Sequence, residues 1–273
     1  MTPTNLRKLD SQHRSEYASP QLILDPRLRR AAAHAIDRKA LADAITDGEG
    51  IVAETVAPPI VSYYEAVERT AARYPYDVRR AEQLMADLGL VKGPDGFFTS
   101  SSTGRHAPEV VGVSEGQEGQ ETTIVVDSLR RAGIDAQLRL VPAAQMQQSD
   151  EMKATYPAWR VNNHYTTATP PLGADRMLGS RAATVDNRWS GTNKSGWSHA
   201  EHDRLFDGWN RALDRGDRNQ LMVQIVRLTS EELPFIPLYF SPNVVVHVAE
   251  LRGPQVPAVQ TTIHGNVHEW AWR

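Results

Sequence analysis

The stretch Leu24-Asp-Pro-Arg-Leu-Arg-Arg-Ala-Ala-Ala-His-Ala-Ile-Asp-Arg38 is the most decisive part of this 273-residue sequence. Asp25 is a good helix N-cap, and Pro26 stands at the first helical position, where a missing N–H costs nothing. Apolar residues recur at helical spacing as far as Ile45, and Gly48 can end the run. The pattern predicts a helix that begins at Asp25 and ends near Gly48.

A second helix entrance lies in Gly191-Thr-Asn-Lys-Ser-Gly-Trp-Ser-His-Ala-Glu-His-Asp203. Ser198 is placed to cap a helix that runs to about Leu213. Another helix is expected from Asp217 to about Glu232, because Asp217-Arg-Asn-Gln220 has the spacing of a capping box. The sequence therefore predicts two consecutive helices in this part of the chain.

Helices and strands alternate in the middle of the sequence. Asp77 caps a helix that stops at Gly89, and a further helix runs from about Gln120 to Gly133. Residues 134–140 then alternate apolar and polar side chains, as in a half-buried strand. Further strands are expected at 108–113, 234–240 and 243–248, with an extended segment at 1–20 and irregular structure over 143–197. This order indicates an α/β fold with helices packed on a sheet.

The composition excludes several classes of function. Thirty basic against 33 acidic residues give a net charge of −3, so nucleic acid is not an expected partner. The absence of cysteine excludes disulfides, thiolate metal sites and a cysteine nucleophile. No apolar run reaches the roughly 18 residues of a membrane span, and the first residues lack the apolar core of an export signal. No direct membrane span is expected.

Five motifs in a fixed order carry a resemblance to a known family. They are LDPRLRRAAAHAIDRKAL, YPYDVRRAEQLMADLGLVKGPDGF, VVDSLRRAGIDAQLRLV, GTNKSGWSHAEHDRLFDGW and EELPFIPLYF, followed by a final LRG. In this order the sequence resembles family 5 of the extracytoplasmic solute-binding proteins, whose members bind peptides, nickel chelates and some sugars. The resemblance extends over roughly residues 20–253.

The resemblance implies a periplasmic-binding-protein-like fold of type II, of which the chain contains only the C-terminal half. Residues 20–234 would form the second, closing lobe, and 1–19 a hinge-crossing lead-in. Residues 235–273 would be the segment that returns to an incomplete first lobe. Apolar side chains of this segment would then lack partners and either fold onto the lobe or invite self-association. They are Val244, Val246, Val248, Trp270 and Trp272.

The resemblance also implies a function. The chain is expected to be the substrate-binding component of an ABC-type importer for peptides or related small solutes, without enzymatic activity or cofactor. Its partners would be that ligand and the permease subunits. The expected location is the periplasm or cell surface, although the chain as given carries no export signal. Because half of the cleft would be missing, binding by this chain alone is expected to be impaired.

Candidate ligand-binding residues come from two polar, aromatic segments, 159–165 and 187–197. Indole, amide and guanidinium groups suit a cleft that holds amphipathic solutes by stacking and hydrogen bonding. Two alternatives remain open, in which the first indole packs inward and the arginine forms a surface ion pair. Family members that bind peptide amino groups place an acid soon after the tryptophan, whereas here the next acid is Asp175. The candidates are Trp159, Asn162, Asn163, His164, Arg188 and Trp197.

Histidines raise the question of a metal site. His199, His202 and Asp203 share one helical face, and His264 and His268 lie close together near the C-terminus. Neither set contains a zinc-protease pattern, and motifs for nucleophilic hydrolases, phosphate loops and dinucleotides are absent. We expect no metal site. Two alternative functions stay open: a repurposed interaction or regulatory module that senses a ligand, and a histidine-dependent metalloenzyme.

Overall fold

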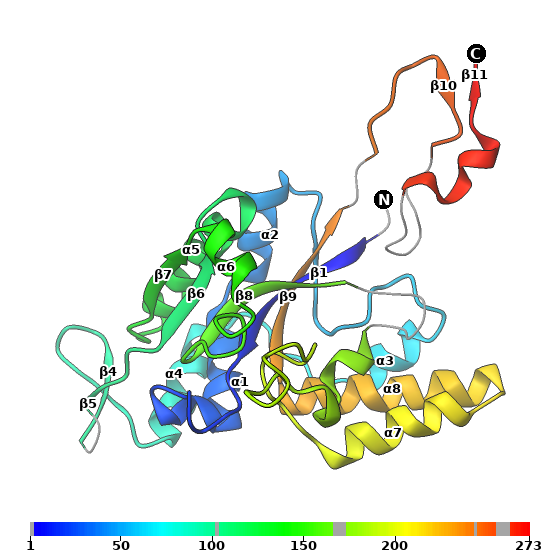
Figure 1. The fold of residues 1–273 in the computed structure, drawn as a ribbon. Helices are drawn as coiled ribbons and strands as arrows, with labels where there is room; N and C mark the ends of the chain where they lie inside the picture. Colours follow the sequence, from blue (N-terminus) through cyan, green and yellow to red (C-terminus); the bar gives the residue numbers. More distant parts are fainter. Residues whose placement is uncertain (1–2, 102–103, 166–172, 243–244, 255–262) are drawn as a thin grey trace.

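A six-stranded mixed sheet forms the centre of the molecule, with the strand order β2-β9-β1-β8-β6-β7 (Figure 1). The computed structural model describes residues 3–101, 104–165, 173–242, 245–254 and 263–273. The strands are β1 (Pro3–Ser11), β2 (Ile51–Val52), β6 (Glu109–Val113), β7 (Gln137–Val141), β8 (Trp159–Tyr165) and β9 (Phe235–Pro242). β6 is parallel to β7 and β8, whereas β1 is antiparallel to β8 and β9.

Shorter elements complete the strand inventory. One small sheet contains β3 (Val91–Lys92), β4 (Phe98–Ser100) and β5 (Gly104–Arg105), and another contains β10 (Leu251–Arg252) and β11 (Ala271–Trp272). The 3-10 helices are η1 (Gln21–Leu24), η2 (Ala174–Met177), η3 (Gly179–Arg181) and η4 (Ile263–Glu269).

Helices pack on both faces of the central sheet. They are α1 (Pro26–Ala35), α2 (Arg38–Thr46), α3 (Tyr64–Thr70), α4 (Val78–Asp87), α5 (Gly116–Arg131), α6 (Ala143–Gln148), α7 (Ala200–Arg211) and α8 (Arg215–Glu232). Leu9 of β1 belongs to the core that contains α1, α2, α4 and α5, and Leu6 to the core that contains α3, α7 and α8. Because alternate strand residues point to opposite faces, these two cores lie on opposite sides of the sheet.

The predicted helix starts rest on side-chain caps that the structure confirms. The Asp25 carboxylate accepts a hydrogen bond from the Arg27 backbone N–H at 2.8 Å. The Asp77 carboxylate accepts one from Arg80 N–H at 3.0 Å. Gly89 follows α4 with φ +80°, a conformation that only glycine adopts without cost. Local capping chemistry therefore fixes these ends, as the sequence indicates.

Three helix predictions were wrong in detail. The run expected from Asp25 to Gly48 is two helices, because Asp37 accepts a hydrogen bond from Ala40 N–H at 2.9 Å and starts α2. The cap of α8 is Asp214 rather than Asp217, and its carboxylate accepts from Asp217 N–H at 3.0 Å. The residue before α7 is His199 rather than Ser198.

The strand predictions differ more. The expected strand at 108–113 is confirmed as β6, but the segment 1–20 contains a central strand, β1, and 143–197 contains α6 and β8. In β7, Leu138 and Leu140 are 42% and 38% exposed, although alternation predicts them buried. β7 is the edge strand of the sheet, so its apolar side chains have fewer neighbours to cover them.

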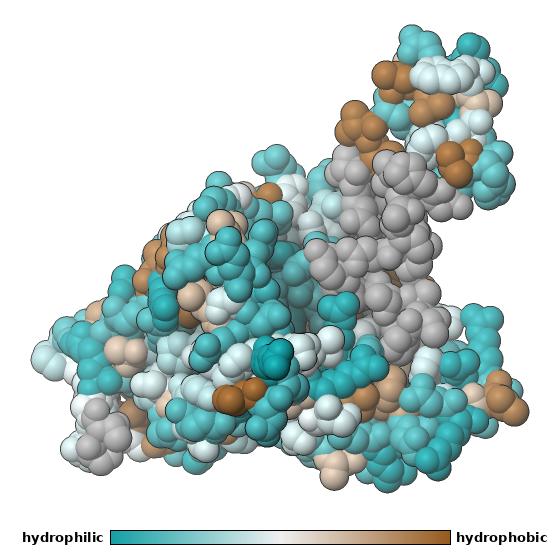
Figure 2. Space-filling view, viewed as in Figure 1, coloured by the Kyte–Doolittle hydropathy of each residue, from teal (hydrophilic) through white to brown (hydrophobic). Residues whose placement is uncertain are grey.

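The C-terminal segment stands away from the sheet beyond the end of β9 (Figure 1). Residues 245–248 do not form the strand expected at 243–248. The side chains of Val246, Val248 and Trp272 are 89%, 54% and 73% exposed, and hydrophobic side chains gather on this segment in Figure 2. They do not fold onto the lobe. Trp270 is half-buried, and Val244 lies outside the described residues.

Candidate functional site

A stripe of charged and polar side chains crosses β1 and β8 on one face of the sheet. Lys8 stands opposite Asn162 in the strand register, and Asp10 stands opposite Arg160. The Lys8 ammonium lies 2.5 Å from the Asp10 carboxylate, whose second oxygen accepts a hydrogen bond from the Asn162 amide at 3.1 Å. Strand alternation places these residues on the face opposite Trp159. The stripe is therefore built by two strands that are about 150 residues apart in the sequence.

Apolar clusters border this stripe on both sides. One contains Val111 of β6, which is opposite Arg160 in the sheet register, together with buried Tyr156. The other contains Leu6 of β1 and Phe235 of β9. The Lys8 ammonium lies 4.6 Å from the centre of the Phe235 ring, a cation–π contact. The face thus offers polar groups between apolar walls, as small-molecule sites generally do.

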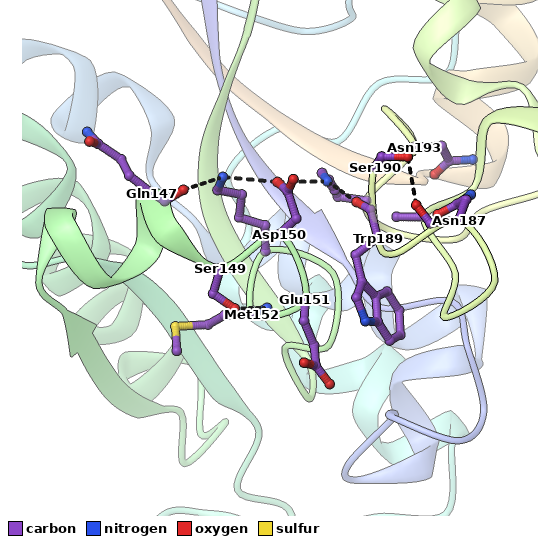
Figure 3. Close-up of polar contacts among 12 residues, drawn as sticks. Gln147, Ser149, Asp150, Glu151, Met152, Asn187, Trp189, Ser190 and Asn193 are labelled. Atoms are coloured by element: carbon purple, nitrogen blue, oxygen red, sulfur yellow. Dashed lines mark hydrogen bonds and ion pairs between the residues drawn. The ribbon is translucent and has the colours of Figure 1, made fainter.

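Two loops form the outer wall above the stripe. Asp150, in the turn after α6, forms ion pairs with Lys153 at 3.0 Å and with Lys194 at 3.1 Å. Lys194 also donates to the backbone oxygen of Trp189, so Asp150 joins the turn to the loop that contains Trp189 (Figure 3). A charge-assisted link of this kind holds both loops over the sheet.

Arg14 fixes the same loop from below. Its guanidinium donates to the backbone oxygens of Ala154, Ala183 and Lys194 at 3.0, 2.7 and 2.9 Å. Gly196 lies directly against it with φ +72°, and a Cβ there would come within 2.6 Å of the Arg14 side chain. A glycine is therefore required at this point of the loop.

The stripe and the loops enclose a hollow made of two adjoining parts. The smaller part, of about 60 Å³, contains Lys8, Asp10 and His164 in its wall. The larger part has a volume of about 390 Å³. Both are bordered by Asn162, Asn163, Arg176, Thr192 and Lys194.

Each part of the hollow has one carboxylate among its described lining residues, and neighbouring lysines lower the pKa of both. Burial alone would raise the pKa of Asp10, but the charge and hydrogen bond of Lys8, with Arg160 and Asn162, hold it below its ordinary value. Hydrogen bonds from Lys153 and then Lys194 lower the pKa of Asp150. Burial lowers the pKa of the Lys194 ammonium, an effect that Asp150 opposes.

Comparison with known proteins places this architecture in a family. Residues 17–184 match the bacterial extracellular solute-binding proteins, family 5 Middle. The chain belongs to this family. No helix among the described residues is long and apolar enough to span a membrane. The family 5 members are solute-binding proteins rather than enzymes, and they act outside the cytoplasm.

Individual relatives confirm the fold. The chain is 23% identical over 236 residues to the oligopeptide-binding protein AppA of Bacillus subtilis, covering 85% of this chain and 42% of that protein. NikZ from Campylobacter jejuni, solved in complex with Ni(L-His), superimposes with a TM-score of 0.79 at 17% identity, over 99% of this chain and 52% of that one. An oligopeptide-binding protein from Thermus thermophilus complexed with a pentapeptide gives 0.72 at 23% identity, over 88% and 42%.

These similarities confirm the type II periplasmic-binding-protein fold that the motifs indicate. The family 5 chain spans about half the length of the proteins it matches, in agreement with a partial chain. β1 lies in the segment expected to be a lead-in, and β9 lies in the segment expected to return. The two are adjacent antiparallel strands of the sheet. They are therefore an integral part of the fold described here.

Half of the ligand-binding candidates lie together at the hollow of this family 5 chain. Asn162, Asn163 and His164 all border it, and they follow one another at the end of β8. The His164 ring is 3% exposed and stacks on Phe235 with a centroid distance of 5.8 Å. The structure thus brings these three predicted residues to one surface.

The other three candidates are elsewhere. Trp159 is 0% exposed and lies in the core beneath α1 and α5, because it alternates with Arg160 along β8 and so points to the opposite face. Trp197 is 5% exposed and packs against the rings of His199 and His202, at 5.7 and 5.2 Å. Arg188 is exposed, with φ +52°, and does not border the hollow. For these three, the structure differs from the expectation of ligand contact.

Several residues of the hollow were missed by sequence reasoning. Lys8 and Asp10 fall in the segment expected to be a lead-in, and no local pattern shows that it pairs with β8. Arg160 had a detectable signal, because Trp159-Arg-Val-Asn162 alternates apolar and polar residues as a half-buried strand does. That alternation places Arg160 and Asn162 on the polar face and Trp159 in the core.

His199 and His202, two of the histidines considered for a metal site, pack against the ring of Trp197. His202 is 0% exposed, and its Nδ1 lies 3.3 Å from a carboxylate oxygen of Asp203. Burial lowers the pKa of His202, which keeps the ring neutral. Within the described parts of the chain, no three histidine, aspartate or glutamate side chains are grouped closely enough to hold a metal ion.

Proposed function

We propose that this chain is the substrate-binding component of an ABC-type importer for peptides or related small solutes. The observation that carries the proposal is the match of residues 17–184 to the family 5 solute-binding proteins. The polar stripe of β1 and β8, bordered by apolar clusters, is the surface on which we place the ligand. Such a surface suits solutes that combine charged and apolar groups.

The range of solutes follows from the relatives. One is solved with Ni(L-His) and another with a pentapeptide, so short peptides and small amino-acid chelates are the solutes to test first. In this proposal the ABC permease subunits are the protein partners, and the protein acts in the periplasm or at the cell surface. Its ligand is held non-covalently.

In this role the chain would consist of a closing lobe, residues 20–234, and two crossing segments. β1 and β9 would connect this lobe to a second one, and closure about these strands would trap the solute. The exposed side chains of Val246, Val248 and Trp272 support the assignment of 235–273 to that second lobe. Since the chain spans 42% of its AppA relative, we propose that the ligand also needs contacts outside this chain.

Isothermal titration calorimetry on the purified chain tests this proposal, with free and end-blocked di- to pentapeptides and nickel-histidine as probes. We expect weak binding, with dissociation constants of about 0.1–1 mM, because one lobe offers roughly half of the contact area. Amide NMR shifts on titration should centre on Asn162 and Thr192. Shifts confined to residues outside the hollow would contradict the site, and submicromolar affinity would contradict the need for a second lobe.

A further inference from the structure

The larger part of the hollow has an excess of positive charge. Four cationic side chains border it, and Asp150 is the one carboxylate among its described lining residues. The cations are Lys153, Arg160, Arg176 and Lys194. Asp150 balances one of these charges, shared between the two lysines, and the Glu118 carboxylate, which interacts with Arg160, balances a second, so two positive charges remain without a negative one. The Lys8–Asp10 pair next to it is neutral as a unit and does not reduce this excess.

Among these four cations, Arg160 is distinguished by a buried N–H group without a partner in the described part of the chain. Its side chain is 6% exposed, and its Nη1 donates to the backbone oxygen of Lys153 at 3.3 Å. Its Nε is buried and makes no hydrogen bond to any residue that the structure describes. A buried donor without a partner costs about 1–3 kcal/mol. The guanidinium of Arg160, a residue that borders the hollow, therefore has hydrogen-bonding capacity that the described residues do not fill.

Arg176 adds a second guanidinium from another element of the wall, η2. It follows Asp175 in η2, and its exposed side chain forms no hydrogen bond or ion pair within the described part of the chain. Guanidinium groups bind carboxylate and phosphate oxygens through two parallel N–H donors. Two arginines around a space of about 390 Å³ leave room for a compact group between them.

Neutral donors complete the wall. The Asn162 amide, the Thr192 hydroxyl and the backbone at Gly191 all border the same space. They can hydrogen-bond to oxygen atoms that the arginines do not reach. A cationic or uncharged solute would leave the positive charges without compensation, whereas an oxyanion would neutralise them.

We propose that this part of the hollow binds a small oxyanion with two or more negative charges, either a polycarboxylate or a phosphate. Arg160 and Arg176 are its bidentate donors, and Lys153 and Lys194 supply further charge. The inference rests on the proposed function, because it makes the oxyanion part of the imported solute. It narrows the solute class to compounds that carry such a group.

Calorimetry of the full chain at low salt tests the inference with two anionic probes, citrate and inorganic phosphate, and with an end-blocked neutral tripeptide. Citrate binding alone identifies a carboxylate site, and phosphate binding alone identifies a phosphate site. Either result supports the inference if Arg176→Gln weakens the binding three- to tenfold. Arg188→Gln is the matched control, since Arg188 is an exposed arginine outside the hollow, and it should leave the affinity unchanged.

Arg160→Gln should weaken the same anion more than tenfold, in a protein whose circular dichroism shows that it is folded. Should this variant not fold, the comparison of Arg176→Gln with Arg188→Gln decides by itself. Equal losses in those two variants, or no binding of either anion, overturn the inference. Binding of the neutral tripeptide without any response to anions overturns it as well, while supporting the proposed solute-binding function.

Discussion

Charged side chains on the two faces of β1 differ in how completely they are paired. Arg7 points into the core beneath α5, where its Nε lies 2.9 and 3.0 Å from the two carboxylate oxygens of Glu121. Tyr239 of β9 donates to the same carboxylate and accepts from Gln117 at 2.7 Å. Lys8, the next residue, points to the hollow. On one face the charges form a closed network, and on the other they face an open space.

The difference separates a structural role from a binding role. Glu121 is 0% exposed, and each of its oxygens has a donor within the protein, so its network has no capacity left for a ligand. Around the hollow, in contrast, Arg160 keeps a buried N–H without a described acceptor. Buried ionic groups that are fully paired hold a fold together, whereas incompletely paired ones indicate a site that accepts a partner.

The largest expected effect comes from opening the closed network. Glu121→Ala should lower the free energy of unfolding by about 3 kcal/mol, because it leaves the buried Arg7 guanidinium with only the more distant carboxylate of Glu118, at 3.7 Å, as a counter-charge. Urea denaturation followed by circular dichroism measures this change. Arg7→Met combined with Glu121→Leu should restore most of the loss, since it removes both charges together.

The exposed ion pair between Glu65 and Arg69 provides the control for this experiment. Their side chains are 82% and 66% exposed, so Glu65→Ala should have a much smaller effect on unfolding. If Glu121→Ala were no more destabilising than Glu65→Ala, the buried network would not stabilise the fold and the contrast between the two faces would fail.

Two histidines, buried His106 and half-buried His13, are kept neutral by their surroundings instead of being paired with a carboxylate. Burial lowers the pKa of His106 to about 4, and burial followed by the charge of Arg29 lowers the pKa of His13 to about 3. In the unfolded chain both pKa values are near 6.5, so between these limits the unfolded state binds more protons. Stability should therefore fall as the pH drops below about 6.5.

Each histidine should account for roughly 2 kcal/mol of this loss between about pH 7 and about pH 4.5. Urea denaturation at both pH values measures it, and His106→Gln should reduce the pH dependence by about that amount. The same pH dependence in the wild type and in His106→Gln would show that this ring is protonated in the folded protein.

Local features of the fold were predictable, and the charged networks were not. The caps at Asp25 and Asp77 and the glycine stop at Gly89 depend on neighbours within four residues, so the sequence shows them directly. Arg7 and Glu121 are 114 residues apart, and they meet because β1 inserts between β8 and β9. Strand pairing of this range has no local signal.

The candidate site illustrates the same limit. Asn162, Asn163 and His164 were predicted together because polar residues cluster in one short segment, and all three border the hollow. For Trp159 the residue type fits both a ligand contact and a core position, and the two-residue period of β8 decides for the core face. Lys194 reaches the hollow because of the fold of its loop, held by Asp150, and no pattern within the loop indicates that position.

A smaller effect is expected from changing the charge beside the hollow. Asp10→Asn keeps the shape of the side chain but leaves Lys8 without its counter-charge, so the positive potential in the adjoining space rises. A unit charge about 10 Å away in a solvated environment changes a binding free energy by roughly 0.5 kcal/mol, so the anion should bind roughly two- to threefold more tightly.

Calorimetry with citrate or phosphate measures this gain in affinity. Asp175→Asn is the control, because Asp175 pairs with Arg181 and does not border the hollow. Weaker anion binding in folded Asp10→Asn than in the wild type would contradict this expectation. It would show that Asp10 matters more for positioning Lys8 and Asn162 than for the electrostatic potential at the anion.

The smallest expected effect on stability belongs to Arg176→Gln. Arg7 and Arg176 are both arginines beside the same sheet, but only Arg7 is bound to a buried carboxylate. Because the Arg176 side chain has no partner among the described residues, its replacement should change the free energy of unfolding by no more than about 0.5 kcal/mol. Any change should be a gain, since the substitution relieves repulsion from Lys194 and Arg160. Urea denaturation at low and high salt measures it, with the gain disappearing as salt screens the repulsion. A clear loss of stability would mean that Arg176 holds the loops together, and its effect on anion binding would then be indirect.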